Sequence, residues 1–157
     1  MITRSFSKSK LIRGRRDARP PGSCLCPLSW CGRQPQEGKP VRVVRIDDIP
    51  AQPANRPIFL GQVETQPLLD DVSEQVRLTV VRFNPGARTK MHTHTFEQVL
   101  LITEGKGIVA TEHEEHIVTP GMVVVIPPGE PHRHGATAET PMAHISITTP
   151  GETTIVE

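Results

Sequence analysis

Short runs of β-branched and other apolar residues alternate with turn sequences from about residue 57 to the end of the chain. Residues 76–83, 96–102, 108–111, 116–118, 122–126 and 143–149 are the predicted strands. Turn sequences such as Asn84-Pro85-Gly86 and Thr119-Pro120-Gly121 separate them. Short strands with turns every ~8 to 12 residues are typical of an all-β sandwich or barrel, and no segment shows a helical period.

The chain of 157 residues is long enough for one small domain plus a tail. We assign residues 46–157 to a single all-β domain and residues 1–45 to an extension. A domain of about 110 residues can close into a small barrel. Closure removes exposed strand edges and leaves a mouth that can hold one ligand.

The extension is basic and differs in composition from the predicted barrel. Residues 1–45 carry eleven Lys or Arg residues against two acids, whereas residues 46–157 carry seven against fifteen. Proline and glycine are frequent there and apolar periodicity is weak, so we predict disorder. Organelle targeting and, less favoured, a nucleic-acid-binding tail stay open, as does an incorrectly chosen start codon. We expect no nucleic-acid partner.

The three cysteines, Cys24, Cys26 and Cys31, all lie in the extension. The predicted barrel therefore has no internal disulfide. Their spacing lacks the fourth ligand of a structural zinc site, and we interpret them as unpaired thiols. No stretch approaches the ~20 apolar residues that span a bilayer. We expect a cytoplasmic protein with no membrane partner.

Three histidines and a glutamine form the strongest candidate site: His92, His94 and Gln98 in one segment, and His132 in a second. Side chains at even spacings along a strand project from one face, so the first three share a face. Glu97 would point away unless a bulge intervened. Imidazoles with an oxygen donor suit a transition metal. We predict that these four residues bind one divalent ion.

Two further histidines could face the same pocket. His134 shares the parity of His132, and His144 lies on an alternating strand with Met142 and Ser146 on its face. A solvated rim position for His134 and a hydrogen-bonded core position for His144 are the alternatives. Arg88 and Lys90 share the parity of His92 and could hold an anionic substrate, although an outward location is favoured.

The two segments resemble the motifs of the cupins, Gly-x5-His-x-His-x3,4-Glu-x6-Gly and Gly-x5-Pro-x-Gly-x2-His-x3-Asn. The matching residues, within about residues 76–148, are Gly86, His92, His94 and Gly105, then Gly121, Pro127, Gly129 and His132. The resemblance implies a jelly-roll barrel, or double-stranded β-helix, and commonly a homodimer. Two positions differ, because Gln98 replaces the acidic ligand and Ala136 replaces the final Asn.

The first difference has a physical consequence. Three neutral imidazoles and a neutral amide leave a divalent cation with its full charge, whereas a glutamate would cancel half of it. Such a cation is a stronger Lewis acid. Resemblance to the glutamine-bearing cupins favours Mn or Fe, although the donor set also suits Ni, Cu, Co or Zn.

A narrower similarity is to the single-domain cupins that include manganese-dependent hydroxynitrile lyases, the (R)-mandelonitrile lyase-like group. It covers His-Thr-His-x3-Gln, then Pro-Pro-Gly-x2-His-x-His-Gly-Ala-Thr, and finally Met-Ala-His-Ile-Ser-Ile. The similarity implies that His144 acts as acid or base near the metal. His134, which shares the parity of His132, is the second candidate for a proton carrier. Met91 and Thr148 stand where that group has a bulky aromatic and a polar amide, which leaves the substrate open.

We therefore expect a metal-dependent cupin enzyme that acts on a small organic molecule, with C–C lyase chemistry of the hydroxynitrile lyase type. A metal-dependent dioxygenase of the quercetin-dioxygenase type is the alternative within enzymes. A non-catalytic small-molecule-binding cupin is the alternative outside them.

Overall fold

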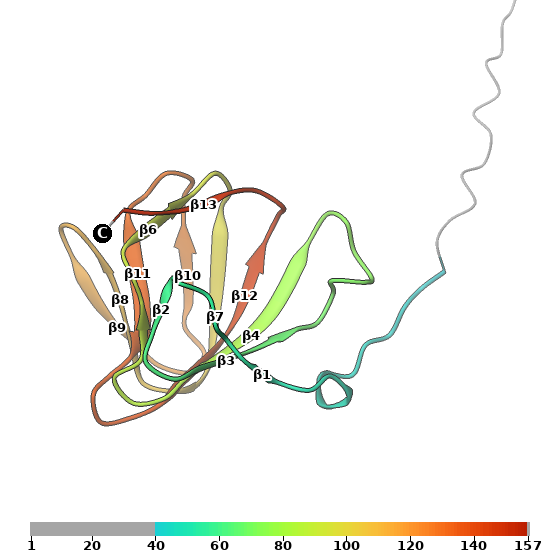
Figure 1. Ribbon diagram of the computed structural model, residues 1–157, viewed down its shortest axis with the longest axis horizontal. Coiled ribbons are helices and arrows are strands. Elements are labelled where there is room, and N and C mark those ends of the chain that lie inside the picture. Colours follow the sequence, from blue (N-terminus) through green and yellow to red (C-terminus); the bar gives the residue numbers. More distant parts are fainter. Residues whose placement is uncertain (1–39, 157) are drawn as a thin grey trace, which may run out of the picture. The chain divides into compact units, whose positions relative to one another are not determined.

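The computed structural model describes residues 40–156 and contains thirteen strands and one 3-10 turn (Figure 1). The turn, η1, spans Ile46–Asp48. The strands are β1 (Gln52–Pro53), β2 (Phe59–Leu60), β3 (Val63–Pro67), β4 (Arg77–Phe83), β5 (Arg88–Thr89), β6 (His92–His94), β7 (Gln98–Gly105), β8 (Gly107–Thr111), β9 (Glu115–Val118), β10 (Val123–Ile126), β11 (His132–Ala136), β12 (Met142–Thr148) and β13 (Thr153–Ile155).

The strands form two antiparallel sheets that enclose a common interior. One sheet has the order β1-β3-β4-β12-β7-β10. The other has the order β13-β6-β11-β5-β2, with β8 also paired to β11 and β9 paired to β8. Strands distant in sequence are therefore neighbours, as when β12 lies between β4 and β7. This crossed order confirms the predicted all-β jelly roll.

The interior changes from apolar to polar along the strands of the six-stranded sheet. At one end, Phe83 of β4 pairs with Met142 of β12, and both side chains are buried in the core cluster. Two residues further on, Val81 pairs with His144, and two further still Thr79 pairs with Ser146. Since every second residue faces inward, the sheet itself separates an apolar floor from a polar pocket.

Gly105 shows how closely the strands approach at the apolar end. It is the last residue of β7, where the chain turns into β8 with φ +69°, and an added Cβ would overlap the carbonyl of Pro141. Only glycine adopts this conformation at little cost and leaves that space open. The turn therefore allows β7 to lie directly against the start of β12.

The predicted runs correspond to β4, β7, β8, β9, β10 and β12, with ends shifted by a few residues. The sequence pattern did not reveal the short strands β1, β2, β5 and β13, because two or three residues are too few to show alternation. β3 was missed as well, because its sequence Val-Glu-Thr-Gln-Pro has one strand-forming apolar residue and no apolar alternation. The strands β6 and β11 were also not among the predicted runs. Their inward positions are occupied by histidines, so they lack an apolar pattern.

Most of the predicted extension, including its cysteines, lies outside the described residues. Its described part, residues 40–45, forms no helix or strand and exposes Val41 and Val43. Within residues 40–156, the structure contains no helix that is long and apolar enough to cross a membrane.

Candidate metal centre and pocket

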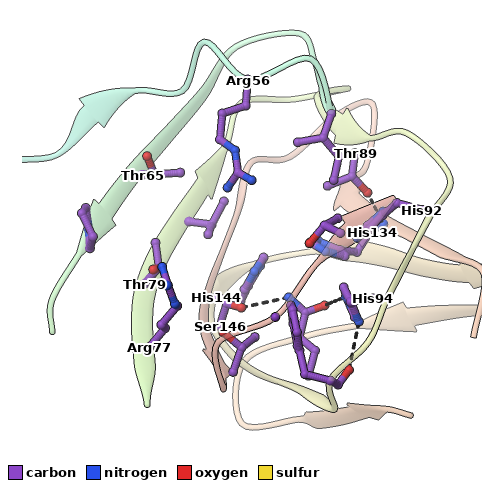
Figure 2. A pocket seen from close by; sticks show the side chains of 18 of the residues that line it. Arg56, Thr65, Arg77, Thr79, Thr89, His92, His94, His134, His144 and Ser146 are labelled. Atoms are coloured by element: carbon purple, nitrogen blue, oxygen red, sulfur yellow. Dashed lines mark hydrogen bonds between the residues drawn. The ribbon is translucent and has the colours of Figure 1, made fainter. Parts of the chain in front are cut away.

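A cavity of about 380 Å³ opens between the two sheets at the polar end of the interior (Figure 2). Both sheets contribute to its wall. His92, His94 and His134 come from the sheet that contains β6 and β11, whereas Gln98, His144 and Ser146 come from β7 and β12. Five histidines, numbers 92, 94, 132, 134 and 144, are buried in or beside this cavity.

His92 and His132 face each other across the β6–β11 pair. Their Cα atoms are register partners, and their ring centroids are 4.2 Å apart. Each Nδ1–H donates to a carbonyl two residues earlier, Lys90 O at 2.8 Å and Glu130 O at 2.9 Å. These bonds fix the tautomer in which Nε2 carries the lone pair, which is the form that binds a metal. The Nε2 atom of His132 is buried and has no hydrogen-bond partner among the described residues.

His94 and Gln98 form a second pair of donors. The Nδ1–H of His94 donates to Phe96 O at 3.2 Å, and its Nε2 lies 3.0 Å from Oε1 of Gln98. The amide Nε2 of Gln98 donates to Ser146 Oγ at 2.9 Å. In this orientation two lone pairs, one on His94 Nε2 and one on Gln98 Oε1, face each other. A cation held by both atoms would relieve that opposition.

His134 lies close to His92 and His132, within reach of the same ion. One nitrogen from each of His92, His132 and His134 lies within 4.8 Å of the others, which makes this triad a possible metal site. His134 is also held by its backbone, because its N–H donates to Thr89 Oγ1 at 3.0 Å. His94 is not in the triad, but its ring centroid is 4.7 Å from that of His132.

His144 lies behind His134, towards the apolar floor. It is fully buried, and neither ring nitrogen has a hydrogen-bond partner among the described residues. Its ring stacks on Phe83, with centroids 5.7 Å apart, and its centroid is 5.0 Å from that of His134. Unpaired buried nitrogens cost free energy, so a ligand or water that bonds to them would be favoured.

Burial keeps all five imidazoles neutral near pH 7. Desolvation lowers the pKa of His132 and of His144 to about 4. It also lowers the pKa of His92, His94 and, most strongly, His134, where the neighbouring histidines add to the effect. Neutral imidazoles bind metal ions, and protonated ones do not.

The residues present therefore fit a divalent transition metal. The fit rests on three observations. The Nε2 of His132 is buried and has no partner among the described residues. The Nδ1 atoms of His92 and His94 are fixed as donors, and Gln98 Oε1 faces the Nε2 of His94. Such outer hydrogen bonds orient metal ligands in proteins. Of the described acidic residues, only Asp70 lines the cavity.

The prediction that Gln98 faces inward assumed one regular strand from His92 to Gln98, but the chain changes sheets between them. β6 ends at His94 in one sheet and β7 begins at Gln98 in the other. Gln98 is buried and Glu97 is exposed. Both orientations agree with the parity argument, although the reason is the change of sheet at residues 95–97 and not continuous alternation.

Sequence reasoning missed two cations in the cavity wall, Arg56 and Arg77. It had singled out Arg88 and Lys90, but neither lines this cavity, and Arg88 is exposed beside a smaller hollow. Arg77 had a signal that could have revealed it, since it shares the parity of Thr79 and Val81 in β4. Arg56 lies in a loop and had none.

A two-sheet jelly roll with inward histidines near one end defines the cupin class, and residues 79–148 match the cupin domain model. The chain belongs to the cupins. It is 42% identical over 93 residues to an (R)-mandelonitrile lyase from Granulicella tundricola, which covers 57% of this chain and 70% of that protein. It is also 33% identical over 64 residues to the transcriptional activator RhaR from Mannheimia succiniciproducens, but covers 23% of that protein and 41% of this chain.

Solved structures agree with the fold. A cupin-like protein from Thermotoga maritima is 36% identical, with a TM-score of 0.56, over 60% of this chain and 77% of that one. The polyketide cyclase RemF from Streptomyces resistomycificus gives a TM-score of 0.68 over 74% of this chain and 86% of that one. Its identity is 21%, so this second likeness concerns the fold alone.

Proposed function

We propose that this protein is a metal-dependent enzyme that cleaves or forms a C–C bond at a hydroxylated carbon of a small organic molecule. The observation that carries the proposal is the group of fixed, neutral imidazoles around the buried unpaired Nε2 of His132. The similarity to an (R)-mandelonitrile lyase supports the type of reaction.

The proposed ligands are His92, His94, Gln98 and His132, and the proposed cofactor is one divalent Mn or Fe ion. Ring contacts support this set, because His132 lies 4.2 Å from His92 and 4.7 Å from His94 between centroids. His134 completes the alternative triad with His92 and His132. When bound, such an ion supplies Lewis acidity towards a substrate oxygen or a departing anion.

His144 and His134 are the proposed proton carriers. His144 is neutral at pH 7 because burial lowers its pKa to about 4, so it is in the form that accepts a proton. His134 stands between His144 and the ligand group, with centroids 5.0 Å from His144 and 5.8 Å from His92. The surrounding apolar floor, with Phe83 stacked on His144, limits the access of water to these nitrogens.

A non-catalytic small-molecule binder is the second candidate. The similarity to the activator RhaR favours it, because it shows that a related sequence segment occurs in a transcriptional regulator. A barrel that keeps a ligand without a metal would support this function over the enzyme. A dioxygenase would instead require redox-active iron or copper, with a spectral change on substrate binding.

We also propose that the protein forms a homodimer through the six-stranded sheet. β10 is an edge strand of that sheet and exposes Val123 and Val125, at 58% and 57% of their surface. Exposed apolar side chains on an unpaired edge favour contact with another copy.

Metal analysis of the purified full chain tests the enzyme proposal. We expect about one equivalent of transition metal per chain and its loss in His132→Ala, which removes the central imidazole. Cleavage of mandelonitrile would then be measured for the wild type and for His144→Ala, with a loss of about 100-fold or more expected from removal of the proton carrier. No stoichiometric metal, even after supplementation, would reject the proposal. Equal cleavage by His144→Ala would reject the role of His144.

A further inference from the structure

Two arginines reach the cavity from elements that carry none of the proposed metal ligands. Arg77 is the first residue of β4, and Arg56 lies in the loop between β1 and β2. Both line the cavity, and Figure 2 shows Arg56 extending into it from the loop above the strands. With the buried histidines neutral, the charged groups that line the described cavity are these two arginines and Asp70. The lining therefore has a net charge of +1 before any metal binds.

The sheet register brings Arg77 close to the ligand group. Thr148 of β12 pairs with Arg77 on one side and with Gln98 on the other. Adjacent strands lie about 4.8 Å apart, so the Cα atoms of Arg77 and Gln98 are about 10 Å apart on the same inward face. A small molecule can thus contact both the guanidinium and the atoms near Gln98 Oε1.

Both guanidinium groups lack a partner among the residues that the structure describes. Within residues 40–156, no side chain or backbone carbonyl accepts a hydrogen bond from, or forms an ion pair with, the guanidinium of Arg56 or Arg77, and Asp70 pairs with neither. Two other arginines of the barrel have partners, since Arg82 donates to Gln66 Oε1 at 2.8 Å and Arg133 lies 3.9 Å from Glu115, whereas the exposed Arg88 has none among the described residues. Two unpaired guanidinium groups beside one cavity are typical of a site for a planar anion.

We propose that Arg56 and Arg77 form a subsite for the carboxylate of a small hydroxy or oxo acid, whose hydroxyl or carbonyl oxygen lies at the histidine group. This rests on the proposed function and narrows its substrate class. The guanidinium fork matches the two oxygens of a carboxylate. Threonine hydroxyls line the wall between the two ends of such a substrate, from Thr79 and Thr148. A neutral cyanohydrin would leave both arginines without a partner.

Calorimetric titration of the metal-supplemented full chain with mandelate and with mandelamide tests this subsite. The two probes share the ring and the hydroxyl and differ in charge. We expect the wild type to bind mandelate about tenfold more tightly or better, the increment of one charge-assisted pair. Arg77→Gln and Arg56→Gln should each weaken mandelate binding about tenfold and leave mandelamide binding unchanged. Arg88→Gln, which changes an exposed arginine outside this cavity, is the matched control and should behave as the wild type.

Equal affinity for the two probes, no binding of mandelate, or unchanged mandelate binding in both cavity variants would each overturn the subsite. Metal content measured on the same samples separates this result from the proposed function. A chain that binds metal but does not distinguish the probes would reject the carboxylate subsite alone. A chain without metal that still prefers mandelate, and loses the preference in Arg77→Gln, would support the subsite and reject the metal-dependent enzyme.

Discussion

The residue that most constrains the chemistry of the pocket is His144. It has no exposed surface and no hydrogen-bond partner for either ring nitrogen among the described residues. Leaving a buried polar group unpaired costs about 1–3 kcal/mol. The barrel tolerates this cost at a position that faces the cavity, and such unsatisfied groups are characteristic of binding or catalytic sites.

The lowered pKa of His144 predicts how the free energy of unfolding of the metal-free protein depends on pH. Burial lowers its pKa to about 4 in the folded state, whereas an unfolded histidine titrates near 6.5. Between these values the unfolded state binds more protons, so stability is complete above about pH 6.5 and is lost as the pH falls towards 4. From pH 7.5 to pH 5, His144 alone should account for about 2 kcal/mol.

Urea unfolding with a chelator present, at both pH values, measures this loss. The variant His144→Gln has no imidazole to protonate and should lose less stability between the two pH values. His134 contributes in the same direction, because burial and its histidine neighbours lower its pKa as well. An identical pH dependence in the wild type and in His144→Gln would show that His144 does not have the lowered pKa.

At the scale of elements, β11 is the strand that pairs with three neighbours and also carries inward histidines. It pairs with β5, β6 and β8, and its two inward histidines face the cavity end of the interior. Gly135 makes this close pairing possible. A Cβ at that position would overlap the carbonyl of Ala87 and lie 2.5 Å from the Cα of Arg88.

We expect Gly135→Ala to destabilise the fold by about 1–3 kcal/mol, because β5 would have to move away from β11. The control is Gly86→Ala, which adds the same methyl group where no atom lies within 4 Å. The cost of this control should come only from its φ of +77°, at about 1 kcal/mol. Thermal unfolding compares the two variants. A melting temperature of Gly135→Ala equal to that of the wild type would contradict the close strand approach.

At the scale of the whole molecule, the outer face of the six-stranded sheet is unusually apolar near β10. Val123 pairs with Leu101 of β7, and Val125 pairs with Val99. Leu101 in turn pairs with Ile145 of β12. These rows of aliphatic residues on a sheet that ends in an unpaired edge are the physical basis for the proposed homodimer.

Replacing Val125 with Lys should convert the proposed dimer into a monomer, because a charge at the centre of an apolar contact must be desolvated. Light scattering coupled to gel filtration measures the mass. The matched control is Ile117→Lys on β9, which is similarly exposed, at 48%, but belongs to the other sheet. A wild-type chain that is monomeric, or a Val125→Lys variant that stays dimeric, would reject this interface.

Sequence alone was sufficient for the class of fold and for most of the pocket's histidines. Alternation of apolar residues is a local property, and it revealed β4, β7 and β12 because those strands are long enough to repeat it. The motif spacing likewise identified His92, His94 and His132 as a group. Gln98 was predicted correctly to face inward. The prediction assumed one continuous strand, whereas the chain passes from one sheet to the other at residues 95–97.

Tertiary structure decided what no local pattern contains. The closeness of His134 to His92 and His132 depends on how β6 and β11 pair, and parity could only state which face His134 shares. The arginines of the cavity depend on the crossed strand order, which places Arg77 one strand away from Thr148 and two from Gln98. The sequence by itself determined a cupin barrel with a cluster of inward histidines. Only the packing of distant strands decided which nitrogens meet and which charges face them, because those distances are set by long-range pairing.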